Sequence, residues 1–216
     1  MWFDACIFDL DGVIVDTAKY HYLSWKRVAE TLGIPFTEKE NERLKGVSRM
    51  ASLEIILEYG NKQYPESRKE ELAEIKNRWY VEYISKMTAD EILPGAVDLL
   101  KELRGSGIKT AIASASKNTP LILERVAIRH LFDAVADGNV VTKAKPDPEV
   151  FLAAASMLGS APSKCIVFED AAAGIRAAHN AGMYCIGTGD PQILSEADLV
   201  ISGLYEINLK RLIELK

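Results

Sequence analysis

The residues best suited to chemistry are two aspartates, Asp9 and Asp11, which directly follow the apolar run of residues 4–8. Residues two apart on an extended chain point to the same side, and ligands of parallel sheets bind beyond the carboxyl ends of the strands. Two carboxylates so close together favour a bound cation or a raised pKa on one of them. This motif alone leaves a solvated Asp-x-Asp-Gly turn as the alternative.

Polar groups also follow three other short apolar runs that we expect to be strands. They are Glu169 and Asp170 after 164–168, Lys143 and Lys145 after 139–142, and Ser114, Ser116, Lys117 and Asn118 after 108–113. Acidic pairs from different strands suit Mg²⁺, while hydroxyl groups and lysine suit phosphate. Taken singly, Lys143 or Lys145 would be an ordinary surface lysine. Taken together, these groups predict a magnesium-dependent phosphoryl-transfer site.

The elements that must position these groups alternate along the chain. Strands are predicted at 4–8, 108–113, 164–168, 183–187 and 198–201, and helices at 96–104, 120–128, 148–158 and 171–181. The strand segments are continuously apolar, as in a parallel sheet that is covered on both faces. The predicted fold class is therefore α/β, with a doubly wound, Rossmann-like parallel sheet.

Residues 18–88 interrupt this alternation with helical patterns only. Trp25, Val28, Ala29 and Leu32 recur at helical spacing, and so do Leu72, Ile75, Trp79 and Tyr83. We interpret 18–88 as a helical cap domain inserted into a core formed by 1–17 and 89–216. Lys76 falls within an otherwise apolar helix face, where it either extends to solvent or meets a ligand.

Composition narrows the function classes. The chain has 216 residues and a net charge of -5, which argues against nucleic-acid binding because that needs a basic face. No apolar stretch reaches the roughly 20 residues of a membrane span, and the N-terminus does not resemble a secretory signal. Cys6, Cys165 and Cys185 each lie in a short apolar run, which is typical of reduced core thiols. These features predict a cytoplasmic protein.

Four motifs in order resemble the haloacid dehalogenase-like superfamily over essentially the whole chain: "DLDG" with Thr17, "IASAS", "KPDPEVF" and "FEDAAAGIRAA". Within that superfamily, "FDLDGVIVDTAKYHY", "LKGVSR" and "SASKN" resemble the β-phosphoglucomutase family. The resemblance implies an α/β core, a four-helix-type cap and Mg²⁺. It also implies interconversion of β-glucose 1-phosphate and glucose 6-phosphate through an aspartyl-phosphate and β-glucose 1,6-bisphosphate.

By this resemblance Asp9 is the nucleophile and Asp11 the general acid and base, roles that suit carboxylates. Ser114 and Lys145 would bind oxygens of the transferring phosphoryl group. The expected Mg²⁺ ligands are Asp9, the main-chain carbonyl of Asp11, Asp170 and, through water, Glu169. A serine that related proteins often carry after the acidic pair is Ala171 here, which removes a hydroxyl that could cap a helix or hold a metal-bound water.

The resemblance also implies a set of substrate-binding residues. Arg49 would hold a phosphate bidentately, residues 116–118 would bind the second phosphate, and His21 would be a hinge residue that contacts the general acid. For residues 45–49, a solvated turn between helices remains the alternative. The full expected set is Thr17, His21, Trp25, Lys45, Gly46, Val47, Ser48, Arg49, Lys76, Ala115, Ser116, Lys117 and Asn118.

Three other functions remain open. A magnesium-dependent phosphatase of small sugar phosphates would share the two aspartates and pass the phosphoryl group to water. A phosphonate hydrolase would need a Schiff-base lysine, for which Lys45 and Lys76 are the candidates. A catalytically silent metal-binding interaction domain is disfavoured by Asp9, Asp11, Lys145 and Asp170. We expect a monomer whose partners are small-molecule sugar phosphates.

Overall fold

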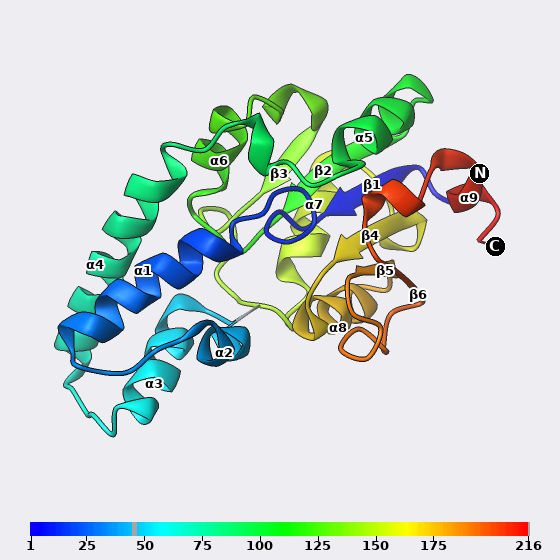
Figure 1. Cartoon of the computed structure of the whole chain (residues 1–216). Coiled ribbons are helices and arrows are strands. Elements are labelled where there is room, and N and C mark those ends of the chain that lie inside the picture. The colour runs from blue at the N-terminus through cyan, green and yellow to red at the C-terminus, as the bar shows by residue number, and fades with distance from the viewer. Residues whose placement is uncertain (45–46, 216) are drawn as a thin grey trace. The chain divides into compact units, whose positions relative to one another are not determined.

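The computed structural model describes residues 1–44 and 47–215. The chain divides into two compact units (Figure 1). One unit combines Met1–Asp16 with Met87–Lys216, and the other is the continuous segment Thr17–Lys86. We refer to them as the α/β unit and the helical unit.

The α/β unit is built on a six-stranded sheet with the strand order β3-β2-β1-β4-β5-β6, in which every neighbouring pair is parallel (Figure 1). The strands are β1 (Ala5–Phe8), β2 (Lys109–Ala113), β3 (Ala134–Ala136), β4 (Cys165–Glu169), β5 (Tyr184–Thr188) and β6 (Leu199–Ile201). Phe8 pairs in register with Ile112 and Phe168. The residues after β1, β2 and β4 therefore meet at one edge, and the predicted doubly wound parallel sheet is confirmed.

The prediction of a strand at 139–142 is wrong. The structure places β3 earlier, at Ala134–Ala136, and residues 138–140 form a turn. The Asp137 carboxylate accepts a hydrogen bond from the Asn139 N–H at 2.8 Å, and the Asp137 carbonyl accepts from Val140 and Val141. This local bonding by an aspartate competes with strand pairing and outweighs the β-propensity of the two valines.

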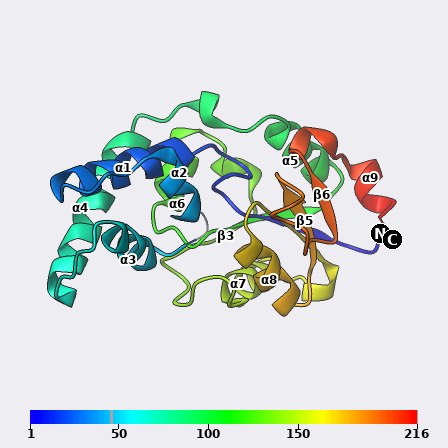
Figure 2. The same ribbon diagram turned by 60° about the horizontal axis from the view of Figure 1, so that its bottom comes forward.

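Helices cover both faces of the sheet. Those of the α/β unit are α5 (Ala96–Gly105), α6 (Thr119–Arg125), α7 (Glu149–Leu158), α8 (Ala172–Asn180) and α9 (Leu209–Ile213). Short 3₁₀ turns occupy Ala89–Glu91, Arg129–Leu131, Pro162–Lys164 and Leu204–Glu206. Figure 2 shows α7 and α8 on one side of the sheet and α5 and α9 on the other. The four helices predicted in this part of the chain are therefore present.

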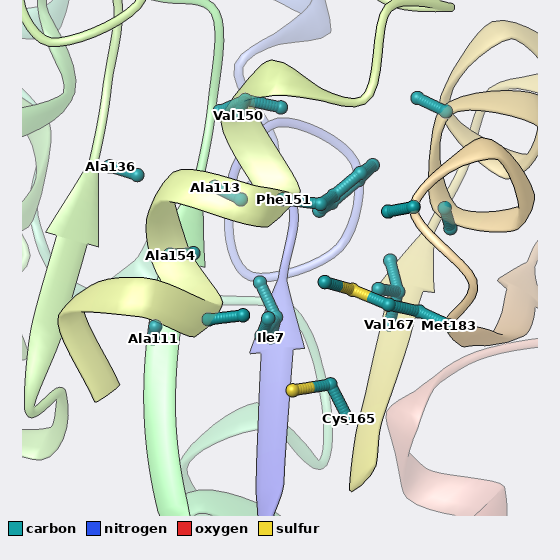
Figure 3. Close-up of a cluster of buried hydrophobic side chains, with 14 of the residues drawn as sticks. Ile7, Ala111, Ala113, Ala136, Val150, Phe151, Ala154, Cys165, Val167 and Met183 are labelled. Atoms are coloured by element: carbon teal, nitrogen blue, oxygen red, sulfur yellow. The ribbon is translucent and has the colours of Figure 1, made fainter. Parts of the chain in front are cut away.

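The core between α7 and the sheet is built from one large ring and several small side chains (Figure 3). Phe151 of α7 is fully buried, and Ala111 and Ala113 line the facing strand β2. Alanines on a strand let a helix approach closely, so the packing fixes α7 firmly. The loop before α7 and the start of α8 are thereby held beside the carboxyl ends of β1 and β4.

The helical unit comprises α1 (Ala18–Thr31), α2 (Glu38–Asn41), a 3₁₀ turn (Glu42–Leu44), α3 (Arg49–Tyr59) and α4 (Glu66–Ile84). Its core includes Trp25, Val28 and Ala29 from α1, as their spacing predicts. Leu53, Ile56 and Leu57 of α3 complete the centre. The unit therefore has a hydrophobic core of its own.

The buried face of α4 differs from the predicted one. Leu72, Lys76, Tyr80 and Ile84 are buried, whereas Ile75, Trp79 and Tyr83 are only half-buried. The Arg27 guanidinium lies 4.1 Å from the centre of the Trp79 ring and covers it, which stabilises an aromatic side chain outside the core. Lys76 is 3% exposed and therefore does not extend to solvent.

Within residues 1–44 and 47–215, none of the helices combines the length and the hydrophobicity that crossing a bilayer would need. The three cysteines are buried and free, as their apolar surroundings predict.

Candidate active site

The carboxyl ends of β1 and β4 bring three carboxylates together. Oxygen atoms of Asp9, Glu169 and Asp170 all lie within 4.8 Å of one another. Glu169 is the last residue of β4, and the Asp9 N–H donates to the Phe168 carbonyl at 2.9 Å, which extends the pairing of β1 and β4 by one residue. Carboxylate oxygens at this spacing are the ligands that a hard divalent cation takes.

A lysine from the loop between β3 and α7 completes the cluster. The Lys145 ammonium donates to Asp9, to Glu169 at 2.8 Å and to the Ala113 carbonyl at 3.4 Å. Lys143 behaves differently, because it is exposed and forms an ion pair with Asp147 at 3.3 Å. The structure thus separates the two lysines of this loop and brings only Lys145 to the carboxylates.

Burial and crowding set the charge state of the cluster. Burial alone would lower the pKa of Lys145, but the negative charges of Asp9 and Glu169 raise its pKa overall, so the ammonium stays charged. Burial raises the pKa of Glu169 to about 7, with Lys145 opposing the shift. Burial and the charges of Asp9 and Glu169 raise the pKa of Asp170 to about 8. A cation placed among these groups would relieve the repulsion that produces these shifts.

Two glycines make room for the carboxylates. A Cβ atom on Gly12 would come within 2.0 Å of an oxygen of Asp170, and Gly12 has a φ of 81°, which side chains disfavour. A Cβ atom on Gly174, in the first turn of α8, would lie 2.0 Å from the Glu169 carboxyl carbon. Both glycines are therefore part of the site, although neither contributes a functional group.

Ala171 stands at the N-terminal cap of α8 and provides no side-chain hydrogen bond there. Its backbone N–H instead donates to the Glu169 carboxylate at 3.2 Å. The orientation of Glu169 is thus set from two sides, by Lys145 and by the start of α8.

The loop after β2 carries the two serines that the sequence singled out. Ser114 is 2% exposed, and its hydroxyl oxygen accepts from the Ser116 N–H at 3.2 Å. The Ser116 hydroxyl oxygen accepts in the same way from the Asn118 N–H at 3.2 Å. A hydroxyl that accepts from the backbone still has its own hydrogen to donate. Ala115 and Lys117 are exposed in this loop.

Asp11 lies in the turn that follows β1. It is half-buried, pairs as an isolated bridge with Val15, and its charge contributes to the raised pKa of Asp170. Asp11 thus lies close enough to the cluster to act on it electrostatically.

Lys76 and His21 form the centre of a second group, in the helical unit. The Lys76 ammonium lies 3.0 Å from Nδ1 of His21, 5.1 Å from the centre of the Trp25 ring and 4.4 Å from that of Tyr80. Burial, then the charges of Lys76 and Arg49, hold the pKa of His21 well below its usual value. The imidazole is therefore neutral, and Nδ1 accepts the hydrogen bond from the ammonium.

Three of the remaining expected residues of the helical unit, Val47, Ser48 and Arg49, lie at the start of α3. Ser48 caps this helix by accepting a hydrogen bond from the Ala51 N–H at 3.3 Å, and Arg49 is its first residue. Val47 is half-buried, and Thr17 is buried directly before α1. Lys45 and Gly46 lie outside the described residues.

Sequence reasoning missed two contributors. Gly174 offers a weak signal as the only glycine of the Ala-rich helix α8. Asn77, whose Oδ1 accepts a hydrogen bond from Nη2 of Arg49 at 3.0 Å, offers none, because nothing in the sequence relates it to a residue 28 positions earlier.

Comparison with known proteins identifies relatives that span nearly all of the chain. The family described as "Hydrolase: haloacid dehalogenase-like hydrolase" matches residues 3–182. The β-phosphoglucomutase of Bacillus subtilis (strain 168) is 48% identical over 212 residues, which are 97% of this chain and 94% of that protein. The crystal structure of β-phosphoglucomutase from Clostridium difficile shares 43% identity and a TM-score of 0.92, covering 99% of this chain and 96% of that one.

A phosphatase also appears among the relatives. The "Phosphorylated carbohydrates phosphatase" of Thermotoga maritima is 33% identical over 183 residues, which are 83% of this chain and 82% of that protein.

Proposed function

The chain belongs to the haloacid dehalogenase-like hydrolase family, and on this basis we propose that it is a phosphomutase that interconverts β-D-glucose 1-phosphate and glucose 6-phosphate. The observation that carries the proposal is the presence of two sets of groups in one chain. The α/β unit holds a carboxylate cluster with Lys145, and the helical unit holds Arg49 and Lys76. A mutase needs both, because its bisphosphate intermediate carries a second phosphate that is not being transferred.

Asp9 is the proposed nucleophile. A carboxylate oxygen of Asp9 attacks the phosphorus of β-glucose 1,6-bisphosphate, the bond from phosphorus to the sugar oxygen breaks, and an aspartyl-phosphate forms. Asp11 gives its proton to the departing sugar oxygen and, in the reverse direction, takes one from the attacking hydroxyl. The ammonium of Lys145 and the Ser114 hydroxyl bind phosphoryl oxygens and stabilise the charge that builds up there.

The donor set fits Mg²⁺, because it consists of carboxylate oxygens that crowd and repel one another. Asp9, Asp170 and the Asp11 carbonyl would hold the ion directly, and Glu169 would do so through water. When bound, the ion supplies positive charge that draws electron density from the phosphoryl group.

The proposal includes small sugar phosphates as the substrates, a cytoplasmic location and a monomeric protein.

Mg²⁺ affinity is expected to fall as the pH is lowered below about 8. The raised pKa of Asp170 means that the metal-free site binds a proton there, and Mg²⁺ must displace that proton. Isothermal titration with Mg²⁺ at several pH values should show about a tenfold loss of affinity per pH unit for each displaced proton. Asp170→Asn serves as the control and should bind Mg²⁺ weakly at every pH. Equal affinity in the wild type at pH 6 and pH 8 would contradict this expectation.

Arg49→Ala is expected to reduce steady-state conversion of β-glucose 1-phosphate sharply. Removing the guanidinium leaves the substrate phosphate without a charged hydrogen-bond donor, which costs about 2 to 4 kcal/mol of binding free energy. Arg49→Lys should be impaired too, because it keeps the charge and loses the planar fork. Phosphorylation of Asp9 by acetyl phosphate, measured by intact-protein mass spectrometry, should persist in both variants. Full mutase activity in Arg49→Ala would remove this residue from substrate binding.

Product analysis with β-glucose 1-phosphate, Mg²⁺ and a trace of β-glucose 1,6-bisphosphate tests the proposal as a whole. Formation of glucose 6-phosphate supports the mutase. Free glucose and inorganic phosphate would instead support the alternative, a magnesium-dependent phosphatase of small sugar phosphates, which the relative from Thermotoga maritima favours.

A further inference from the structure

We propose that Asn77 is a positioning residue that orients the Arg49 guanidinium for a phosphate group without cancelling its charge. This inference rests on the proposed function, since it takes Arg49 as the residue that binds a substrate phosphate. It adds a residue from a different helix and explains why an amide, rather than a carboxylate, stands at position 77.

The contact joins two helices of the helical unit. Arg49 is the first residue of α3, whose start is fixed by the Ser48 cap, and Asn77 lies in the middle of α4. Nη2 of Arg49 donates to Oδ1 of Asn77 at 3.0 Å, and both side chains are half-buried. Because a guanidinium only donates, the Asn77 oxygen must face it. One nitrogen of the fork is therefore held, which restricts the rotation of a long and otherwise flexible side chain.

The second argument is charge. In the part of the chain that the structure describes, Arg49 makes no ion pair. Burial lowers the pKa of Arg49, and Tyr80 and then Glu74 oppose this effect through their charges without pairing with the guanidinium. A carboxylate is the usual partner of a half-buried arginine and would bind the guanidinium more strongly than an amide does. It would also neutralise the charge and compete with an incoming phosphate. The neutral amide orients the fork and leaves its full positive charge available.

The surroundings of Arg49 strengthen this argument. Lys76 and Arg49 both lower the pKa of His21, so the two cations act on the same region of the helical unit. Like charges in one region repel each other, and a dianion would relieve the repulsion. A carboxylate at position 77 would relieve it permanently and remove part of the reason for a phosphate to bind.

The test measures binding of glucose 6-phosphate to the full-length protein by isothermal titration calorimetry, which does not depend on turnover. The variants are Asn77→Ala, Asn77→Asp, Arg49→Ala and the double variant, with Arg78→Ala, an exposed neighbour on α4, as the matched control. Thermal unfolding is measured for each protein in parallel.

We expect Asn77→Ala to weaken binding about tenfold, the value of one lost hydrogen bond to a charged group. Asn77→Asp should weaken binding by at least about another tenfold, because its charge opposes the phosphate. Its unfolding temperature should nevertheless stay equal or rise, since the aspartate pairs with Arg49. The double variant should bind no more weakly than Arg49→Ala alone, because Asn77 acts through Arg49. Arg78→Ala should match the wild type.

Three results would overturn the inference. One is that Asn77→Asp binds glucose 6-phosphate as tightly as the wild type, and another is that Arg49→Ala keeps wild-type affinity. The third is that the loss of affinity in the double variant equals the sum of the two single losses in free energy. A failure of the proposed function looks different. If the wild type releases glucose and phosphate in the product analysis, the mutase assignment fails, while the binding measurements still decide the role of Asn77.

Discussion

Asp9→Asn should abolish turnover, with a loss of more than about 10⁴-fold, the scale on which removal of a covalent nucleophile acts in other enzymes. The substitution keeps the shape of the side chain and removes the charge that must attack phosphorus. No aspartyl-phosphate should be detectable by mass spectrometry after incubation with acetyl phosphate. The fold should survive, because the change relieves repulsion among three carboxylates and the buried Lys145 keeps Glu169 as its ion-pair partner at 2.8 Å.

The same strand offers a matched control. Asp4 is exposed and directly precedes β1, while Asp9 directly follows it. Asp4→Asn should therefore retain wild-type phosphorylation and turnover. A phosphorylated Asp9→Asn or Asp9→Ala protein would show that another residue accepts the phosphoryl group.

Asp11→Asn should lower turnover by a factor of about 10² to 10⁴, the usual contribution of general acid and base catalysis. The variant keeps the main-chain carbonyl that we propose as a metal ligand, so Mg²⁺ affinity should change little. Slow phosphorylation of Asp9 by acetyl phosphate should continue, because this leaving group needs little help from an acid. Burst kinetics and a Mg²⁺ titration on the same sample separate these effects.

Near-normal turnover in Asp11→Asn would remove this residue from proton transfer. A large loss of Mg²⁺ affinity would instead indicate that its carboxylate, and not its carbonyl, matters to the metal.

The sequence predicted β1, β2 and β4 well because these strands are short, largely apolar and almost entirely buried. Polar residues cluster at or directly after the carboxyl ends of these apolar runs, so the sequence pattern alone assigns Asp9, Ser114 and Asp170 to one edge of the sheet. Parallel pairing then brings these residues together irrespective of their separation along the chain. The strand before Lys145 was misplaced, so the strand pattern did not distinguish Lys145 from Lys143; the resemblance of the "KPDPEVF" motif did, and the packing of the loop brings only Lys145 to the carboxylates.

The helical unit was harder to predict. Several faces of α4 carry apolar residues, so periodicity alone favoured Ile75 and Trp79 over the buried Tyr80. Which face is buried depends on the partners, including the Arg27 side chain that covers Trp79. The contact of Arg49 with Asn77 depends on how two helices pack side by side, and a single sequence does not report this. The close approach of Gly174 to Glu169 is likewise a property of three-dimensional packing.

The burial of all three cysteines has a practical consequence for studies of motion. Cys6, Cys165 and Cys185 are 0% exposed, and burial raises the pKa of each thiol. Thiol reagents react with exposed thiolates, so the native protein should remain unlabelled by maleimides. Cysteines introduced at exposed positions, such as Glu30 on α1 and Lys101 on α5, would then take a donor and an acceptor dye in an otherwise unmodified chain. Single-molecule fluorescence could follow the distance between the two units during turnover without first replacing any native residue.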